Sequence, residues 1–74
     1  MKKHLLEIMA KSTKSSIVSR VEASEMTGKM ISPATLRNLD SLGKGPKVRV
    51  RMGRKVGYSV SSFIEWCSEH LEVC

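Results

Sequence analysis

Basic side chains gather in the middle of this 74-residue chain, where they could bind phosphate. Eight of the thirteen Lys and Arg residues lie between Lys29 and Lys55, and Asp40 is the only acid among them. Residues 1–28 carry five basic and three acidic side chains, and residues 56–74 carry Glu but no Lys or Arg. Because nearby acids do not neutralise the central cations, this segment is suited to attract a polyanion.

The residues that commonly bind metals or act in catalysis do not match known motifs in this sequence. Cys67 and Cys74 match no metal-binding or redox motif, and the two His residues do not complete a zinc site. The sequence offers no pair of nucleophile and base and no phosphate-binding glycine loop, and we expect neither an enzyme nor a cofactor. Both cysteines are expected to be reduced thiols, with Cys67 packed in the interior.

The termini and the apolar segments favour a cytoplasmic protein of one domain. No apolar run approaches the ~20 residues that span a membrane. Glu7 and Lys11 interrupt the apolar start of the chain, so it is not interpreted as a signal peptide. Residues 1–16 are expected to form an N-terminal arm or a short helix, and residues 17–74 the folded domain.

Two short helices are predicted from their end signals. Ser19 with Glu22 has the spacing of a capping box, which predicts a helix over about residues 20–27 that ends at Gly28. Ser32 as N-cap with Pro33 at the first position predicts a second helix over about residues 33–42. Three leucines should form the buried stripe of that second helix: Leu36, Leu39 and Leu42.

The opposite face of the second helix is a candidate for base recognition. It carries small or polar side chains: Ala34, Arg37, Asn38 and Ser41. In a major groove, an Arg can bind guanine through two hydrogen bonds and an Asn can bind adenine in the same way. Ser32 and the amides at the helix start are suited to hold a phosphate. Two such helices form either a helix-turn-helix or an ordinary helical hairpin with a solvated face.

Gly43 ends the second helix, and Gly45-Pro46 leads into a predicted β-hairpin. Residues 47–52 alternate strictly, with Val48, Val50 and Met52 expected on the inner face. Gly53-Arg54 fits a two-residue turn, and residues 55–60 return with Val56 and Tyr58 expected on the inner face. The remaining cations of the hairpin are candidates for phosphate contact: Arg49, Arg51, Arg54 and Lys55.

A last helix is predicted after the hairpin, with Ser61 or Ser62 as its N-cap. Its apolar stripe comprises Phe63, Trp66 and Cys67, and Trp66 is expected in the core beneath the hairpin. Three acids should lie on the outer face of this helix: Glu65, Glu69 and Glu72.

The order of these segments resembles the MerR-like winged-helix modules of phage excisionases and AlpA-type regulators. The similar segments are EASEMTG (residues 22–28), ISPATLRNL (residues 31–39), Gly43 with Gly45-Pro46, and MGRKVGYSVSSFIEW (residues 52–66). The resemblance implies an α+β fold, a small winged helix-turn-helix with two short helices, a two-stranded β-hairpin wing and a C-terminal helix. It implies that Thr35 and Arg37 lie near the DNA backbone or groove, and that the Arg and Lys residues of the wing reach phosphates or the minor groove.

Together these features predict a sequence-specific protein that binds double-stranded DNA without cofactor or metal. The resemblance favours an excisionase of a phage or mobile element, a recombination directionality factor that bends DNA and assists an integrase. We expect association with the nucleoid, and neighbouring copies that touch along direct repeats of the DNA site.

Other functions stay open at this point. An AlpA-type transcriptional regulator fits the same features. A winged-helix adaptor that binds an acidic protein partner is a second class of function. RNA binding is a third, and the few aromatic residues favour it least.

Overall fold

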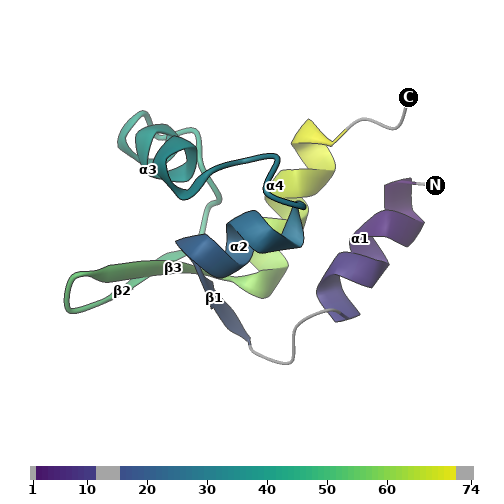
Figure 1. The fold of residues 1–74 in the computed structure, drawn as a ribbon, viewed down its shortest axis with the longest axis horizontal. Coiled ribbons are helices and arrows are strands. Elements are labelled where there is room, and N and C mark those ends of the chain that lie inside the picture. The colour runs from purple at the N-terminus through teal and green to yellow at the C-terminus, as the bar shows by residue number, and fades with distance from the viewer. Residues whose placement is uncertain (1, 12–15, 72–74) are drawn as a thin grey trace.

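The computed structural model describes residues 2–11 and 16–71 of the chain. Within them it has four helices and a three-stranded antiparallel sheet. The elements are α1 (Lys2–Lys11), β1 (Ile17–Ser19), α2 (Arg20–Met26), α3 (Pro33–Ser41), β2 (Arg49–Met52), β3 (Lys55–Ser59) and α4 (Val60–His70). Figure 1 shows α2 and α4 at the centre, α1 at one end of the molecule, and α3 with the β2–β3 hairpin at the other end.

The sheet has the order β1-β3-β2, so the return strand of the predicted hairpin lies in its middle. Met52 pairs with Lys55 across the two-residue turn that the sequence predicts, and Gly53 has a φ of 65° there. The two-stranded sheet expected from the sequence is wrong, because β1 adds a third strand, with Val18 opposite Tyr58. A strand of three residues is too short to display the alternation by which strands are recognised.

The register of β2 and β3 corrects the predicted faces of the hairpin. Arg49 pairs with Tyr58 and Arg51 pairs with Val56. Because paired residues of antiparallel strands point to the same face, both arginines share a face with Tyr58 and Val56. The expected arrangement, with arginines on one face and all apolar side chains on the other, is therefore wrong.

The second face of the hairpin is open to solvent. Met52 is 85% exposed, Val48 is largely exposed, and Val50 is half-buried. The prediction that these three side chains cover the core is wrong. The alternation in β2 correctly separates the strand into two faces. The apolar face was predicted to be the buried one, but the core lies on the face of the buried Tyr58, which also carries Arg49 and Arg51.

Helices α2 and α3 begin at the predicted residues, and each ends one residue before its predicted end. Ser19 Oγ accepts a hydrogen bond from Glu22 N (3.1 Å), and Glu22 Oε1 accepts one from Ser19 N (3.0 Å). Ser32 Oγ accepts a bond from Thr35 N at the start of α3. Beyond each helix a glycine has the left-handed conformation that a side chain would disfavour, with a φ of 67° at Gly28 and 72° at Gly43.

The buried stripe of α3 differs from the predicted one. Leu36 is fully buried and Leu39 partly buried, but Leu42 is 67% exposed, so its expected place in the core is wrong. At about 100° per residue, the directions of Leu42 and Leu36 differ by about 120° around the helix axis, whereas those of Asp40 and Leu36 differ by only about 40°. The inner face of α3 therefore contains Asp40 in place of Leu42.

The core lies between the sheet, α2, α3 and α4. Its buried apolar residues are Val18, Ala23, Leu36, Tyr58, Phe63, Trp66 and Cys67. The rings of Tyr58, Phe63 and Trp66 stack in a row, with centroids 6.1 and 5.9 Å apart. The expected core position of Trp66 is confirmed, and its Nε1 donates a hydrogen bond to the backbone oxygen of Lys44 (2.9 Å).

Helix α4 begins earlier than the sequence predicts. Ser59 is its N-cap and accepts a hydrogen bond from Ser62 N (3.1 Å), so the prediction of Ser61 or Ser62 is wrong. Ser62 is buried, and its Oγ accepts a bond from Val48 N (2.8 Å). This bond ties α4 to the chain just before β2.

The N-terminal segment, expected as an arm or a short helix, forms α1 and packs against α4. Leu6 and Met9 contact the core, although no residue of α1 is fully buried. Among the described residues, no helix has the length and apolar character to cross a membrane. Glu72 and Cys74, for which the sequence made predictions, lie outside the described residues.

Candidate functional site

The outward face of α3 presents the side chains expected to read bases. Its exposed residues are Ala34, Thr35, Arg37, Asn38 and Ser41. Ser41 Oγ donates to the backbone oxygen of Asn38 (2.8 Å), and the hydroxyls of Ser32 and Thr35 lie 2.9 Å apart. The Arg37 guanidinium has no hydrogen-bond or ion-pair partner among residues 2–11 and 16–71. Arg37 can therefore donate all of its hydrogen bonds to a ligand.

The hairpin cations divide into two groups. Arg49 and Arg51 point to the same face of the sheet, and Arg49 Nη1 lies 3.8 Å from Asp40 Oδ1 of α3. This face therefore opens toward α3. Arg54 lies in the exposed turn, and Lys55 pairs with Met52 on the second face. The structure thus brings Arg49 and Arg51 to the α3 side, but not Lys55.

A buried acid connects α3 with the hairpin, and sequence reasoning missed it. The Asp40 side chain is 3% exposed. Its Oδ2 accepts hydrogen bonds from Arg20 Nη2 (2.8 Å) and from the Tyr58 hydroxyl (2.6 Å), and Arg20 Nε donates to the Tyr58 oxygen (3.2 Å). The available signal was the spacing of Asp40 four residues after the buried Leu36, which puts both on the inner face of α3.

Burial and hydrogen bonds shift the pKa values of Tyr58 and Arg20. Burial raises the pKa of Tyr58 to about 12, and the hydrogen bond to Asp40 contributes in the same direction. Burial alone would lower the pKa of Arg20, but its hydrogen bonds to Asp40 and Tyr58 raise that pKa above its ordinary value. Tyr58 is therefore a protonated donor and Arg20 a cation at neutral pH.

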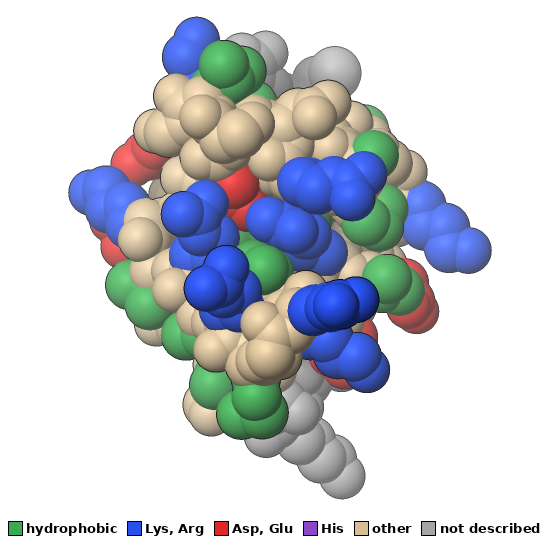
Figure 2. Space-filling view, turned by 90° about the vertical axis from the view of Figure 1, so that its left-hand side faces the viewer, with side chains coloured by type: hydrophobic (Ala, Val, Ile, Leu, Met, Phe, Trp, Pro, Cys, Tyr) green, Lys and Arg blue, Asp and Glu red, His purple; other side chains and the backbone are tan. Residues whose placement is uncertain are grey.

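Basic side chains concentrate on the end of the molecule where α3 and the hairpin lie. Figure 2 shows Lys and Arg side chains grouped across this face, with an acidic patch recessed among them. A polar hollow of about 310 Å³ lies between the end of α3 and the start of the hairpin. It is lined by Asp40, Gly43, Gly45, Pro46, Lys47 and Arg49. The face can accept phosphates over its arginines and a polar group in the hollow.

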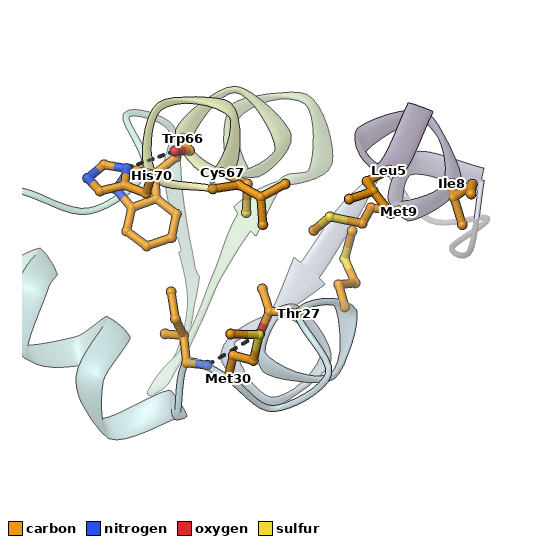
Figure 3. Close-up of a pocket in the computed structure, with 11 residues that line it drawn as sticks. Leu5, Ile8, Met9, Thr27, Met30, Trp66, Cys67 and His70 are labelled. Atoms are coloured by element: carbon orange, nitrogen blue, oxygen red, sulfur yellow. Dashed lines mark hydrogen bonds between the residues drawn. The ribbon is translucent and has the colours of Figure 1, made fainter. Parts of the chain in front are cut away.

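An apolar groove of about 390 Å³ lies on another part of the molecule, between α1, α4 and the α2–α3 turn (Figure 3). Leu5, Ile8 and Met30 line it from α1 and the turn, and Trp66 and Cys67 line it from α4. Its few polar groups bond to backbone: Thr27 Oγ1 donates to Ser24 O, and His70 Nδ1 lies 2.9 Å from Trp66 O. The groove offers no convergent set of titratable groups for catalysis.

Neither metal ligands nor a reactive thiol stand out among the described residues. No group of three or more His, Cys, Asp or Glu residues in residues 2–11 and 16–71 is placed to hold a metal ion. Cys67 is buried, and burial raises the pKa of its thiol to about 11, so it is not a nucleophile at neutral pH.

Comparisons with known proteins give no relative from which a function could be carried over. No protein-family model, no curated protein and no solved structure matches the chain. The placement of its own side chains therefore carries the functional interpretation.

Proposed function

We propose that this chain is a small winged helix-turn-helix protein that binds double-stranded DNA in a sequence-specific manner. The single observation that carries the proposal is the joint orientation of two surfaces. The exposed face of α3, with Arg37 and Asn38, and the arginine face of the hairpin border the same basic end of the molecule. The contacts of Asp40 with Arg20, Tyr58 and Arg49 join these two surfaces.

In this proposal α3 enters the major groove, where its small and polar face allows a close approach to base edges. Arg37 and Asn38 are the main readers of bases, with Ala34 and Ser41 beside them. Ser32 and Thr35, at the start of α3, lie next to a phosphate. The hairpin acts as the wing and contacts the neighbouring backbone and minor groove through Arg49 and Arg51 on the face toward α3 and through Arg54 in the turn.

The biological role that best fits this architecture is that of an excisionase. The resemblance of residues 22–28, 31–39 and 52–66 to excisionases and AlpA-type regulators supports it. The protein would bind direct repeats near a recombination site, bend the DNA and assist an integrase without catalysing a reaction itself. A transcriptional regulator of the AlpA type would use the same surface, and footprinting on an attachment region distinguishes the two roles. Either role places the protein on the nucleoid in the cytoplasm.

The proposal is tested by the salt dependence of binding to duplex DNA. Fluorescence anisotropy with a duplex of random sequence and with a duplex enriched by selection would be measured between 50 and 200 mM NaCl. Each phosphate that a cation neutralises should contribute about −0.9 to the slope of log K against log salt. Arg51→Ala with Arg54→Ala should weaken binding to both duplexes.

The matched control is Lys2→Ala with Lys3→Ala, because it removes the same charge from α1 at the other end of the molecule. This control should bind nearly as the unaltered protein does. Equal losses in both double variants would show that net charge alone drives binding. A flat salt dependence, or no binding to random duplex at low salt, would favour a protein-binding adaptor instead.

A further inference from the structure

The two carboxylate oxygens of Asp40 have different roles. Oδ2 accepts both strong hydrogen bonds, from Arg20 Nη2 at 2.8 Å and from the Tyr58 hydroxyl at 2.6 Å. Oδ1 faces Arg49, whose Nη1 lies 3.8 Å away, which is an ion pair without a hydrogen bond. One carboxylate therefore serves two guanidinium groups, and the cluster keeps one positive charge in excess.

Of the two guanidinium groups, that of Arg49 is the more exposed. The Arg49 side chain is 49% exposed, whereas that of Arg20 is 21% exposed. A guanidinium has five N–H donors in a fixed plane, so one edge can face Asp40 while the others face a ligand. Residue 45 must be small for this arrangement, because a side chain on Gly45 would collide with Asp40 Oδ1.

Arg51 provides a comparison within the same strand. It is exposed and points to the same face as Arg49, two residues along β2. Among residues 2–11 and 16–71 it has no carboxylate partner. The two arginines thus differ mainly in whether a carboxylate lies beside the guanidinium.

We propose that Asp40 positions Arg49 so that Arg49 discriminates between DNA sequences, while Arg51 supplies attraction to phosphates of any sequence. The inference rests on the proposed DNA-binding function. A carboxylate 3.8 Å away offsets the attraction of Arg49 for a phosphate and repels phosphates that arrive on its own side. An acceptor at the open edge of the guanidinium, in contrast, meets donors that are already oriented and lose little freedom on binding. Asp40 is a positioning residue in this proposal, and Arg49 makes the contact.

The test compares Arg49→Gln with Arg51→Gln on the selected duplex and on a duplex of random sequence. Both side chains are exposed, so both variants should keep the fold. Arg51→Gln should weaken binding to both duplexes alike and reduce the salt slope by about 1. Arg49→Gln should weaken binding to the selected duplex by about tenfold, weaken binding to the random duplex by less than about twofold, and reduce the salt slope by clearly less than Arg51→Gln does.

Asp40→Asn provides a second test of the proposed role of Asp40. It should release Arg49, strengthen binding to the random duplex and make the salt slope steeper by up to about 0.9. These changes should be much smaller when Asp40→Asn is added to Arg49→Gln, because Arg20, the other cation beside Asp40, is only 21% exposed. If Asp40→Asn does not fold, the comparison of the two arginine variants decides by itself.

Similar behaviour of Arg49→Gln and Arg51→Gln on both duplexes would overturn the inference and leave the proposed DNA binding intact. Absence of salt-dependent DNA binding by the unaltered protein would overturn the proposed function and the inference together.

Discussion

The hydroxyl of Tyr58 in β3 donates a hydrogen bond of 2.6 Å to Oδ2 of Asp40 in α3. The two residues are 18 positions apart in the chain, and Tyr58 is fully buried. The same hydroxyl oxygen accepts a hydrogen bond from Arg20 Nε of α2, so the Tyr58 side chain connects the hairpin with both α2 and α3. Figure 1 shows α3 and the hairpin at the same end of the molecule, and this cluster joins them there.

Tyr58→Phe should therefore destabilise the protein without creating a cavity. It removes the donor to a buried carboxylate, and hydrogen bonds to charged groups contribute about 1.5–3 kcal/mol. We expect a loss of this size in the free energy of unfolding, measured by urea denaturation with the fluorescence of the single tryptophan, Trp66. Arg51→Ala, an exposed change in the same sheet, should alter stability by less than about 0.5 kcal/mol. A loss no larger in Tyr58→Phe than in this control would show that the bond contributes nothing.

Stability should also fall at alkaline pH. Tyr58 has a pKa of about 12 in the folded protein and the ordinary value of 10.0 when unfolded, and the Cys67 pKa rises from 9.0 to about 11. Between these values the unfolded chain has lost protons that the folded protein keeps, so rising pH favours unfolding. The stability linked to Cys67 is complete below pH 9 and lost toward pH 11, and that linked to Tyr58 is lost between pH 10 and 12.

Urea unfolding at pH 8, 10 and 11 would measure this decline, which is at most about 1.4 kcal/mol per pH unit for each group. Tyr58→Phe and Cys67→Ala should each make the decline shallower, because the titrating group is gone. A free energy of unfolding that stays constant up to pH 11 would contradict the prediction.

The features that the sequence predicted correctly depend on neighbouring residues. The capping box of Ser19 and Glu22, the helix end at Gly43 and the turn at Gly53 each involve groups within about five positions. The exposed residues of α3 were also predicted from local features, because the start of a helix and its period determine the direction of each side chain. Local chemistry therefore identified most of the elements and the outward face of α3.

The features that it missed depend on residues far apart in the chain. Strand β1 is recognised only by its pairing with β3, about 40 positions later. The spacing from Leu36 indicates that Asp40 faces inward, but its partners Arg20 and Tyr58 lie far away in the chain, and no local pattern connects them with it. For the same reason the sequence could identify Arg49 as a candidate contact but not distinguish it from Arg51, since only the fold brings a carboxylate to Arg49.

The N-cap of α4 is Ser59, where the sequence predicted Ser61 or Ser62, and this difference can be tested directly. Ser59 Oγ accepts the hydrogen bond from Ser62 N, whereas Ser61 is exposed and no bond involves its side chain in the described part of the chain. Ser59→Ala should lower the free energy of unfolding by about 1 kcal/mol, the usual effect of losing an N-cap. Ser61→Ala should have an effect below about 0.5 kcal/mol. The reverse order, measured by urea denaturation, would restore Ser61 as the cap.

Two glycines of the hairpin should differ in their tolerance of alanine. A Cβ at Gly57 would lie 2.5 Å from the backbone oxygen of Val18, so Gly57→Ala must separate β1 from β3. We expect a loss of about 3 kcal/mol, as for an overpacked interior. A Cβ at Gly53 meets open space, and Gly53→Ala should cost only about 1 kcal/mol for its positive φ. Equal losses in thermal unfolding would mean that β1 is not held against β3.

The proposed roles of α3 in base recognition and of the hairpin in phosphate contact lead to a prediction on DNA binding. Arg37 lies on the exposed face of α3 and has no partner among the described residues, so a base edge can use its full set of donors. Arg37→Ala should cost about 1–3 kcal/mol on the selected site and relax the preference for the base that it contacts. Arg51→Ala should weaken binding to all sequences to a similar extent and reduce the salt slope by about 1. Selection of binding sites with each variant, followed by titration at several salt concentrations, separates the two effects. If both variants bind as the unaltered protein does, α3 does not lie in the major groove and the hairpin does not act as a wing.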